Sequence, residues 1–224
     1  MSLKGLFYRI IHFRWNWFRE AYLTYKYVDD YDVFPAIYIP NGVKLKITKG
    51  VGAKFIVKNK LKIEKWKTEN AYSTITLAGN AELFIENEFI IGDGVKISIS
   101  NNGKLVLRGK KYDSGSGITA NSVVLVKKYL EIGYDCIIAW DTFLTDCDWH
   151  SIDGKPAQID TIIEDKVWIG VGAKILKGAH IGNNSIVTSN SVVLKGTYPA
   201  RTLLSGSPAQ TIKQNIPQWH RDLK

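Results

Sequence analysis

Residues 163–192 read Ile163-Glu-Asp-Lys-Val-Trp168, Ile169-Gly-Val-Gly-Ala-Lys174, Ile175-Leu-Lys-Gly-Ala-His180, Ile181-Gly-Asn-Asn-Ser-Ile186 and Val187-Thr-Ser-Asn-Ser-Val192. Each unit of six opens with Ile or Val, and its fifth residue is Val, Ala or Ser. A period of six fits neither an amphipathic helix nor a plain strand. It is typical of a hexapeptide parallel β-helix, in which short strands coil so that one aliphatic residue per side points inward.

The same period returns elsewhere in the chain with interruptions. Clean units of six stand at 132–137, 138–143 and 144–149, and weaker echoes stand at 51–56, 77–82 and 91–96. The register slips around 64–72 and 109–117, and the second of these segments is rich in turn residues. We therefore expect an all-β domain, a parallel β-helix over residues 36–195, followed by a C-terminal tail at 196–224.

The first 35 residues have a different pattern and are expected to form a helical extension. Apolar residues recur at helical spacing from Leu3 to Ala21, interleaved with basic and further aromatic residues. A basic, aromatic amphipathic helix can lie on an anionic membrane surface. We favour the alternative that it packs against the β-helix, because such coils need a cap over their exposed end.

Composition narrows the classes of protein that fit. The 224 residues carry a formal charge of +9, and nine lysines fall between residues 41 and 70. No nucleic-acid-binding motif accompanies this charge, so we expect solvated strand faces and no nucleic-acid partner. The chain shows no apolar run of membrane-spanning length and no signal-peptide pattern, which predicts a cytoplasmic protein. Residues 1–30 could in addition give it a peripheral membrane contact.

The repeat is broken between Trp149 and Ile162, where we expect a loop to leave the coil. Loops on rigid scaffolds often carry site residues, and His150 stands where this loop leaves the coil, close in the chain to Asp146 and Asp148. A neutral imidazole is the side-chain base available at cellular pH. Strand alternation would place the three residues on one face, so that either carboxylate, or a backbone carbonyl, could hold the second ring nitrogen.

Three segments carry a resemblance to a known family: Trp140 to His150, Val167-Trp-Ile-Gly170, and Ser205-Gly-Ser-Pro-Ala209. Together they resemble the hexapeptide-repeat acyltransferases, particularly the maltose and galactoside O-acetyltransferase group and its relatives in capsule and O-antigen loci. The resemblance implies a left-handed β-helix, a homotrimer with sites between subunits, acetyl-CoA as cosubstrate and no metal. It also implies that His150 is the general base that deprotonates a saccharide hydroxyl, a role worth about 10²–10⁴ in rate.

Residues for coenzyme A follow from the same resemblance. Trp168 and Gly170 match positions that border the pantetheine arm, and Ala173 and Ser189 match small positions that leave the backbone exposed. Lys195 and Lys213 match basic residues that lie near the nucleotide phosphates, where a point charge suffices. The sequence departs from the family at Gln210, where the family commonly has Arg or Lys beside the phosphates.

Several alternatives remain open at this point. The acceptor could be the amine of a nucleotide-linked amino sugar, or the coil could be a non-catalytic scaffold. A γ-type carbonic anhydrase shares this coil but uses three histidines on a metal, and this chain has only His12, His150, His180 and His220. Cys147 as an acylated nucleophile would give ping-pong kinetics, whereas we expect Cys147 to serve in packing.

Overall fold

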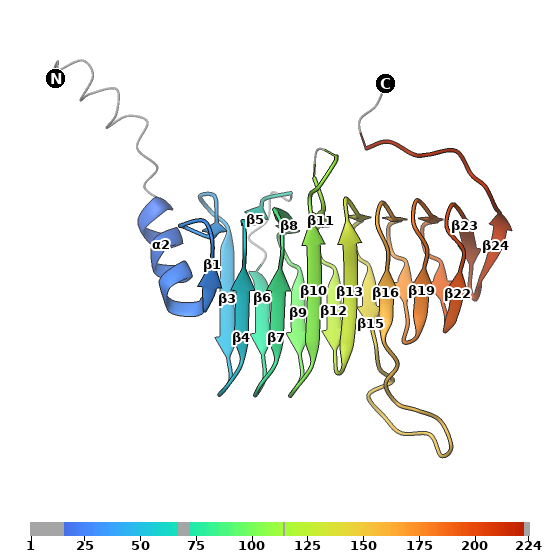
Figure 1. The fold of residues 1–224 in the computed structure, drawn as a ribbon, viewed down its shortest axis with the longest axis horizontal. Coiled ribbons are helices and arrows are strands. Elements are labelled where there is room, and N and C mark those ends of the chain that lie inside the picture. Colours follow the sequence, from blue (N-terminus) through green and yellow to red (C-terminus); the bar gives the residue numbers. More distant parts are fainter. Residues whose placement is uncertain (1–15, 67–71, 114, 222–224) are drawn as a thin grey trace.

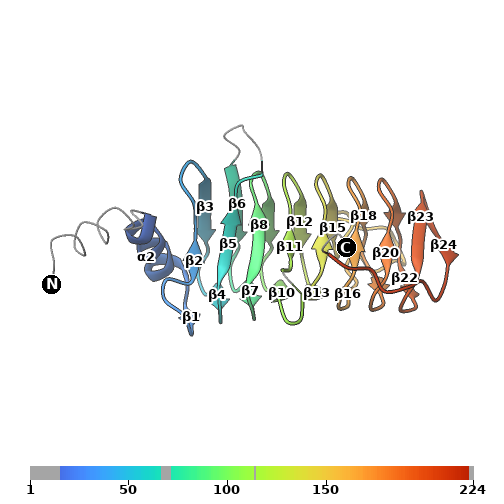
Figure 2. The ribbon, with the colours of Figure 1, turned by 90° about the horizontal axis from the view of Figure 1, so that it is seen from above.

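The computed structural model describes residues 16–66, 72–113 and 115–221. These residues form a long three-sided prism in which every turn of the coil adds one strand to each of three parallel sheets (Figures 1 and 2). A helix, α2 (Asn16–Tyr27), closes one end of the prism, and the C-terminal tail leaves from the other end and turns back along it.

The strands fall into the three sheets in strict rotation. Sheet A contains β1 (Asp30–Tyr31), β4 (Lys54–Val57), β7 (Glu82–Ile85), β10 (Lys104–Gly109), β13 (Tyr129–Tyr134), β16 (Thr161–Ile163), β19 (Ala179–Ile181) and β22 (Gly196–Tyr198). Sheet B contains β2 (Ile37–Tyr38), β5 (Leu61–Glu64), β8 (Phe89–Gly92), β11 (Gly117–Ile118), β14 (Ile137–Ile138), β17 (Trp168–Ile169), β20 (Ile186–Val187), β23 (Leu203–Gly206) and the antiparallel β24 (Ala209–Lys213). Sheet C contains β3 (Lys44–Lys49), β6 (Tyr72–Leu77), β9 (Lys96–Ile99), β12 (Val123–Val126), β15 (Phe143–Thr145), β18 (Lys174–Ile175) and β21 (Val192–Val193).

The hexapeptide period sets the core of the C-terminal half. The residues that open each unit between 163 and 192 are all fully buried, and so are the small fifth residues between them: Ile163, Ile169, Ile175, Ile181 and Val187, with Val167, Ala173, Ala179, Ser185 and Ser191. Ile162 pairs with His180 one coil further on, which is a step of 18 residues. The repeat-based fold prediction is therefore confirmed in this region.

The N-terminal half departs from the six-residue rule. Its strands are mostly four to six residues long, and Lys54 pairs with Glu82, so that one coil takes 28 residues. The predicted hexad opening at Val51 is wrong, because Val51 lies in a turn and is 92% exposed, while Phe55 and Val57 fill the core. Longer strands bury alternate residues of a period-two pattern, which competes with the hexad.

Helix α2 covers the open end of the coil with polar as well as apolar groups. Thr24 Oγ1 accepts hydrogen bonds from the backbone N–H groups of Ala36 (3.1 Å) and Ile37 (3.2 Å). Glu20 Oε1 accepts a third from Ile39 (3.0 Å). These donors lie in or next to β2, the first strand of sheet B, which has no preceding coil to receive them. The expected packing of the N-terminal helix against the coil is confirmed for Asn16–Tyr27, whereas residues 1–15 lie outside the described residues.

Among the described residues, no helix is long and apolar enough to cross a membrane.

The hydrogen bonds that Thr24 of α2 accepts at the end of the coil lead to a prediction about stability. Thr24→Val keeps the shape of the side chain but leaves the Ala36 and Ile37 N–H groups buried without an acceptor, so we expect the free energy of unfolding to fall by about 1–3 kcal/mol. Urea denaturation followed by circular dichroism measures this change. Thr48→Val, at an exposed position of β3, is the matched control and should shift the midpoint little. Equal midpoints for the two variants would show that the cap bonds add nothing.

Candidate active site

The coil opens after β15, where the chain leaves the corner between sheets C and A as a short hairpin (lower edge in Figure 1). Cys147 pairs with Gln158 in an antiparallel bridge, and Asp148 N donates to Ala157 O at 2.9 Å. A second bridge joins Ile152 and Lys155 across the turn. The predicted loop is therefore an ordered hairpin whose stem begins at Cys147, before the chain rejoins sheet A at Thr161.

His150 lies on the outgoing arm of this hairpin and is exposed to solvent. The residue before it, Trp149, has a positive φ of 64°, and most other non-glycine residues in this region of φ are Asn or Asp. A left-handed conformation at a bulky residue costs of order 1 kcal/mol or more and persists only where the surroundings impose it. The strained turn at Trp149 directs the chain away from the coil immediately before the imidazole.

Asp146 has a structural contact that the sequence pattern did not reveal. Its carboxylate is fully buried and accepts three backbone N–H groups of the turn before β13: Lys127 (2.8 Å), Lys128 (2.6 Å) and Tyr129 (2.7 Å). Asp146 O also accepts Ile159 N at 2.9 Å. Asp146 thus fastens the base of the hairpin to the previous coil.

Asp148 forms an ion pair with Lys177, whose ammonium group also donates to Pro156 O at 2.6 Å. Lys177 follows β18 on the next coil, so this pair ties both arms of the hairpin to the prism. The expected alternation of Asp146, Asp148 and His150 on one face does not extend through the segment, because β15 ends at Thr145 and Asp146 is buried while the other two are exposed.

The residues expected to contact coenzyme A are spread along the C-terminal coils. Trp168 is 42% exposed and stands in the outward row of sheet B, in register with Ile186, Leu203 and Lys213 on the following strands. Strands are about 4.8 Å apart, so along this wall the three steps from β17 to β24 span about 14 Å between the backbones of Trp168 and Lys213. A thin, extended ligand that ends in phosphates fits such a wall.

The other residues predicted to contact coenzyme A differ in their exposure and lie at different corners of the coil. Ser189 is exposed at the turn between sheets B and C, whereas the methyl group of Ala173 is fully buried. A Cβ at Gly170 would lie 2.6 Å from Ser189 N, so glycine is required there by the stacking of the coils. Lys195 is exposed, but it lies at the corner between sheets C and A, on the same edge as the hairpin.

The C-terminal tail adds residues that the sequence reasoning did not single out. The Trp219 ring lies 6.1 Å from the Trp168 ring, and Trp219 Nε1 donates to Lys166 O at 2.8 Å. Ile216 is buried and exchanges two 3.0 Å bonds with Arg201: Ile216 N donates to Arg201 O, and Arg201 Nε donates to Ile216 O. A single tryptophan in an otherwise polar tail is the feature of the sequence that could have indicated this packing.

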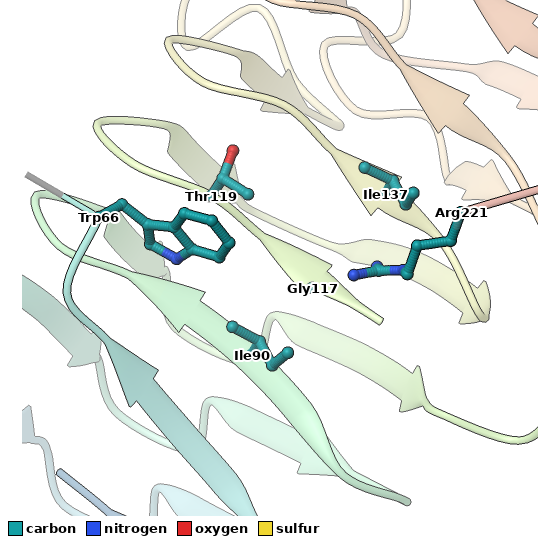
Figure 3. A pocket seen from close by; sticks show the side chains of 6 residues that line it. All are labelled: Trp66, Ile90, Gly117, Thr119, Ile137 and Arg221. Atoms are coloured by element: carbon teal, nitrogen blue, oxygen red, sulfur yellow. The ribbon is translucent and has the colours of Figure 1, made fainter. Parts of the chain in front are cut away.

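Beyond Trp219 the tail continues over the outer face of sheet B. Figure 3 shows Arg221 and Trp66 reaching from opposite sides toward Gly117, above a floor that includes Ile90 and Ile137. The cavity between them measures about 30 Å³, which is room for a water molecule and too small for a sugar or a pantetheine arm. This contact anchors the tail rather than forming a substrate pocket.

The predicted site residues thus form two groups on different parts of the prism. His150, Asp148 and Lys195 lie at the edge between sheets C and A, while Trp168 and Lys213 lie on sheet B, where Trp219, which was not predicted, packs beside Trp168. Sheet C separates this edge from the corner at Ser189, and Figure 1 shows the hairpin and the tail on opposite sides of the molecule. One chain does not bring the expected base and the expected cofactor wall together.

Three other residues with reactive side chains are His180, Cys136 and Cys147. His180 pairs with Glu164 at 2.6 Å on the outer face of sheet A. Cys136 is buried, and burial raises the pKa of its thiol to about 12. Burial also raises the pKa of the Cys147 thiol, which argues against a thiolate nucleophile at that position.

Comparison with known proteins agrees with this architecture. Residues 160–195 match the family described as bacterial transferase hexapeptide (six repeats). The polysialic acid O-acetyltransferase of Escherichia coli O1:K1 / APEC is 32% identical over 124 residues, which are 53% of this chain and only 39% of that protein. A protein of Escherichia coli K12 named as a lipopolysaccharide biosynthesis O-acetyl transferase, WbbJ, is 30% identical over 148 residues, which are 52% of this chain and 74% of that one.

A solved structure extends the similarity to most of the chain. The polysialic acid O-acetyltransferase OatWY has a TM-score of 0.62 and 26% identity, over 88% of this chain and 90% of that chain. The fold is thus the left-handed parallel β-helix of the hexapeptide-repeat enzymes. The chain belongs to the hexapeptide-repeat transferase family, which confirms the resemblance and favours an enzyme over a non-catalytic scaffold.

The contacts of the two aspartates predict losses of stability of different size. Asp146→Asn removes the charge from a fully buried carboxylate that accepts three backbone N–H groups, and should lower the free energy of unfolding by about 1–3 kcal/mol. Asp148→Asn removes one half-exposed ion pair and should cost less than about 1 kcal/mol. Urea midpoints of the two variants, compared with the parent chain, measure the difference. A larger loss for Asp148→Asn would contradict the assignment of Asp146 as the anchor.

Proposed function

We propose that this protein transfers an acetyl group from acetyl-CoA to a hydroxyl of a saccharide, with His150 as the general base, and that it acts as a homotrimer. The observation that carries the proposal is the ordered hairpin at 147–158, which interrupts the coil and presents an exposed imidazole on a rigid support. Two relatives that each match about half of this chain are named as O-acetyltransferases of polysialic acid and of lipopolysaccharide biosynthesis, which supports this acceptor class.

In the proposed reaction, the acceptor hydroxyl gives its proton to the free nitrogen of His150 while its oxygen attacks the thioester carbonyl. The tetrahedral intermediate then collapses, the C–S bond breaks, and the imidazolium of His150 returns the proton to the leaving sulfur, so that coenzyme A departs as the thiol. The contacts of Asp146 and Asp148 hold the hairpin against the coil. The backbone of His150 is therefore held in place before substrate arrives. In this scheme Asp146 and Asp148 position the support of His150.

The separation of the two groups of residues supports an assembly in which neighbouring copies share a site. The hairpin of one copy, with His150 and Lys195 at its edge, would face the sheet B wall of the next copy. There Trp168, Gly170, Ala173 and Ser189 would border the pantetheine arm, and Lys213 would lie by the phosphates. Trp219 packs beside Trp168 and would form the second side of the groove, so the tail would close the cofactor site.

A second acceptor class is supported by one observation. The 2,3,4,5-tetrahydropyridine-2,6-dicarboxylate N-acetyltransferase of Staphylococcus aureus is 42% identical over 59 residues, although these are 26% of this chain and 24% of that protein. An amine uses the same base and the same thioester, so N-acetylation of an amino sugar is the alternative. The O-acetyltransferase relatives match about twice as much of this chain.

The central test is thiol release. Acetyl-CoA with a panel of neutral, acidic and amino saccharides should release free coenzyme A, and His150→Ala should lower kcat by about 10²–10⁴, because proton removal from the acceptor would then fall to water. A thiol-reactive dye measures release, and mass spectrometry identifies the acetylated product.

The control for this test is assembly. Size-exclusion chromatography with light scattering should show that His150→Ala keeps the oligomeric state of the parent chain. Full activity in the variant would remove His150 from the mechanism, and no turnover with any saccharide would count against the proposed acceptor class.

A mixing experiment tests whether neighbouring copies share one site. His150→Ala and Trp168→Ala should each be severely impaired, yet co-expressed copies carrying different tags should recover about a quarter of the parent activity, because one interface in four pairs an intact His150 with an intact Trp168 in a cyclic assembly. If both groups act within one chain, the mixed assemblies would show no recovery above the sum of the two variants.

A further inference from the structure

Helix α2 packs on the coil with a face that includes polar side chains, and it exposes aromatic side chains to solvent. At about 100° per residue, Glu20, Leu23 and Thr24 share one face, and this face packs on the coil. The polar members of that face, Glu20 and Thr24, are 3% and 0% exposed and accept the N–H groups at the end of the coil. Folding therefore uses polar side chains of the helix on the inside.

The opposite face of α2 is aromatic and open to solvent. It is centred on Phe18, Tyr22 and Tyr25, whose exposed fractions are 59%, 56% and 84%. Trp17 and Phe34 extend this patch, with their ring centroids 6.2 Å apart. We call these five residues the aromatic face. A solvent-exposed cluster of large rings is uncommon on soluble proteins and marks an interaction surface.

Basic charge is concentrated in the same part of the chain. Residues 1–70 contain 14 of the 30 basic residues but only six of the 21 acidic ones, so they account for +8 of the formal +9. On α2 itself, Arg19 and Lys26 are exposed beside the aromatic face, and Lys26 Nζ lies 5.3 Å from the centre of the Tyr22 ring. Aromatic rings flanked by cations match the interface of an anionic bilayer, where rings sit at headgroup depth and cations pair with phosphates.

We propose that the aromatic face of α2 docks the protein, by its N-terminal end, on a bilayer that contains anionic lipids. The partner is a lipid surface rather than a second copy, because a second copy would bring the same excess of positive charge against this end. The surface lies at the far end of the prism from Trp168 and Lys213 (Figure 1), so docking leaves the proposed catalytic edge and cofactor wall accessible. The proposal does not depend on the acetyl transfer.

Vesicle sedimentation tests the proposal with the full chain. We expect binding to phosphatidylcholine vesicles that contain about 30% phosphatidylglycerol, and much weaker binding to phosphatidylcholine alone. Raising the salt from 0.1 M to 0.5 M should weaken binding, because screening shortens the reach of the charges. Phe18→Ser with Tyr25→Ser should lower the partition coefficient about tenfold, because two rings no longer enter the interface.

The matched control is Tyr112→Ser with Ile212→Ser, which removes two equally exposed apolar side chains elsewhere on the prism and should leave the partition coefficient unchanged. Circular dichroism and the thermal midpoint check that each variant folds, and Tyr25→Ser alone serves if the double variant does not. Absence of binding to anionic vesicles, or equal binding by both double variants, would overturn the proposal. So would a smaller assembly of Phe18→Ser/Tyr25→Ser without vesicles, which would mark the aromatic face as a contact between copies.

Discussion

The structure depends on the parallel stacking of each coil on the one before it. Every strand donates and accepts along the prism axis, and the inward column of Ile, Val and Leu side chains is shielded from water only because the next coil lies directly above. The stacking also dictates the close approaches at the corners, such as Gly170 against the backbone of Ser189. A coil of this kind has two open ends and three outer faces, and the distinctive features of this chain lie at these places.

The two ends are closed by different physical means. At the N-terminal end, α2 supplies acceptors to unpaired N–H groups through Thr24 and Glu20, which forces its rings outward. At the C-terminal end, β24 turns back antiparallel on β23, and the tail then runs along the prism through Ile216 and Trp219. The closure of each end also leaves an exposed surface: the aromatic face of α2 at one end, and the partly exposed Trp168 beside Trp219 nearer the other.

The placement of His150 also follows from the stacking of the coils. A hairpin can be inserted at a corner without disturbing the coils, because Phe143 still pairs with Lys174 across the insertion. The hairpin then needs its own supports. Asp146 at its base binds the preceding coil, and Asp148 pairs with Lys177 of the following coil. Rigid placement of an exposed imidazole, rather than a buried pocket, is what this scaffold offers, and a neighbouring copy can supply the rest of the site.

The amino-acid sequence alone determined the coil between residues 132 and 195, because a period of six has one structural solution and each unit is read locally. It also determined that the coil is interrupted before Ile162 and that a histidine stands at the interruption. It could not determine the path of the N-terminal coils, since longer strands follow a period of two, and Val51 was misread for that reason. Only the tertiary structure decided the contacts made between coils: Asp146 holds a turn 18 residues earlier, Trp219 reaches Trp168, and Glu20 faces inward. These contacts join residues far apart in the chain, and no local pattern encodes which of them meet.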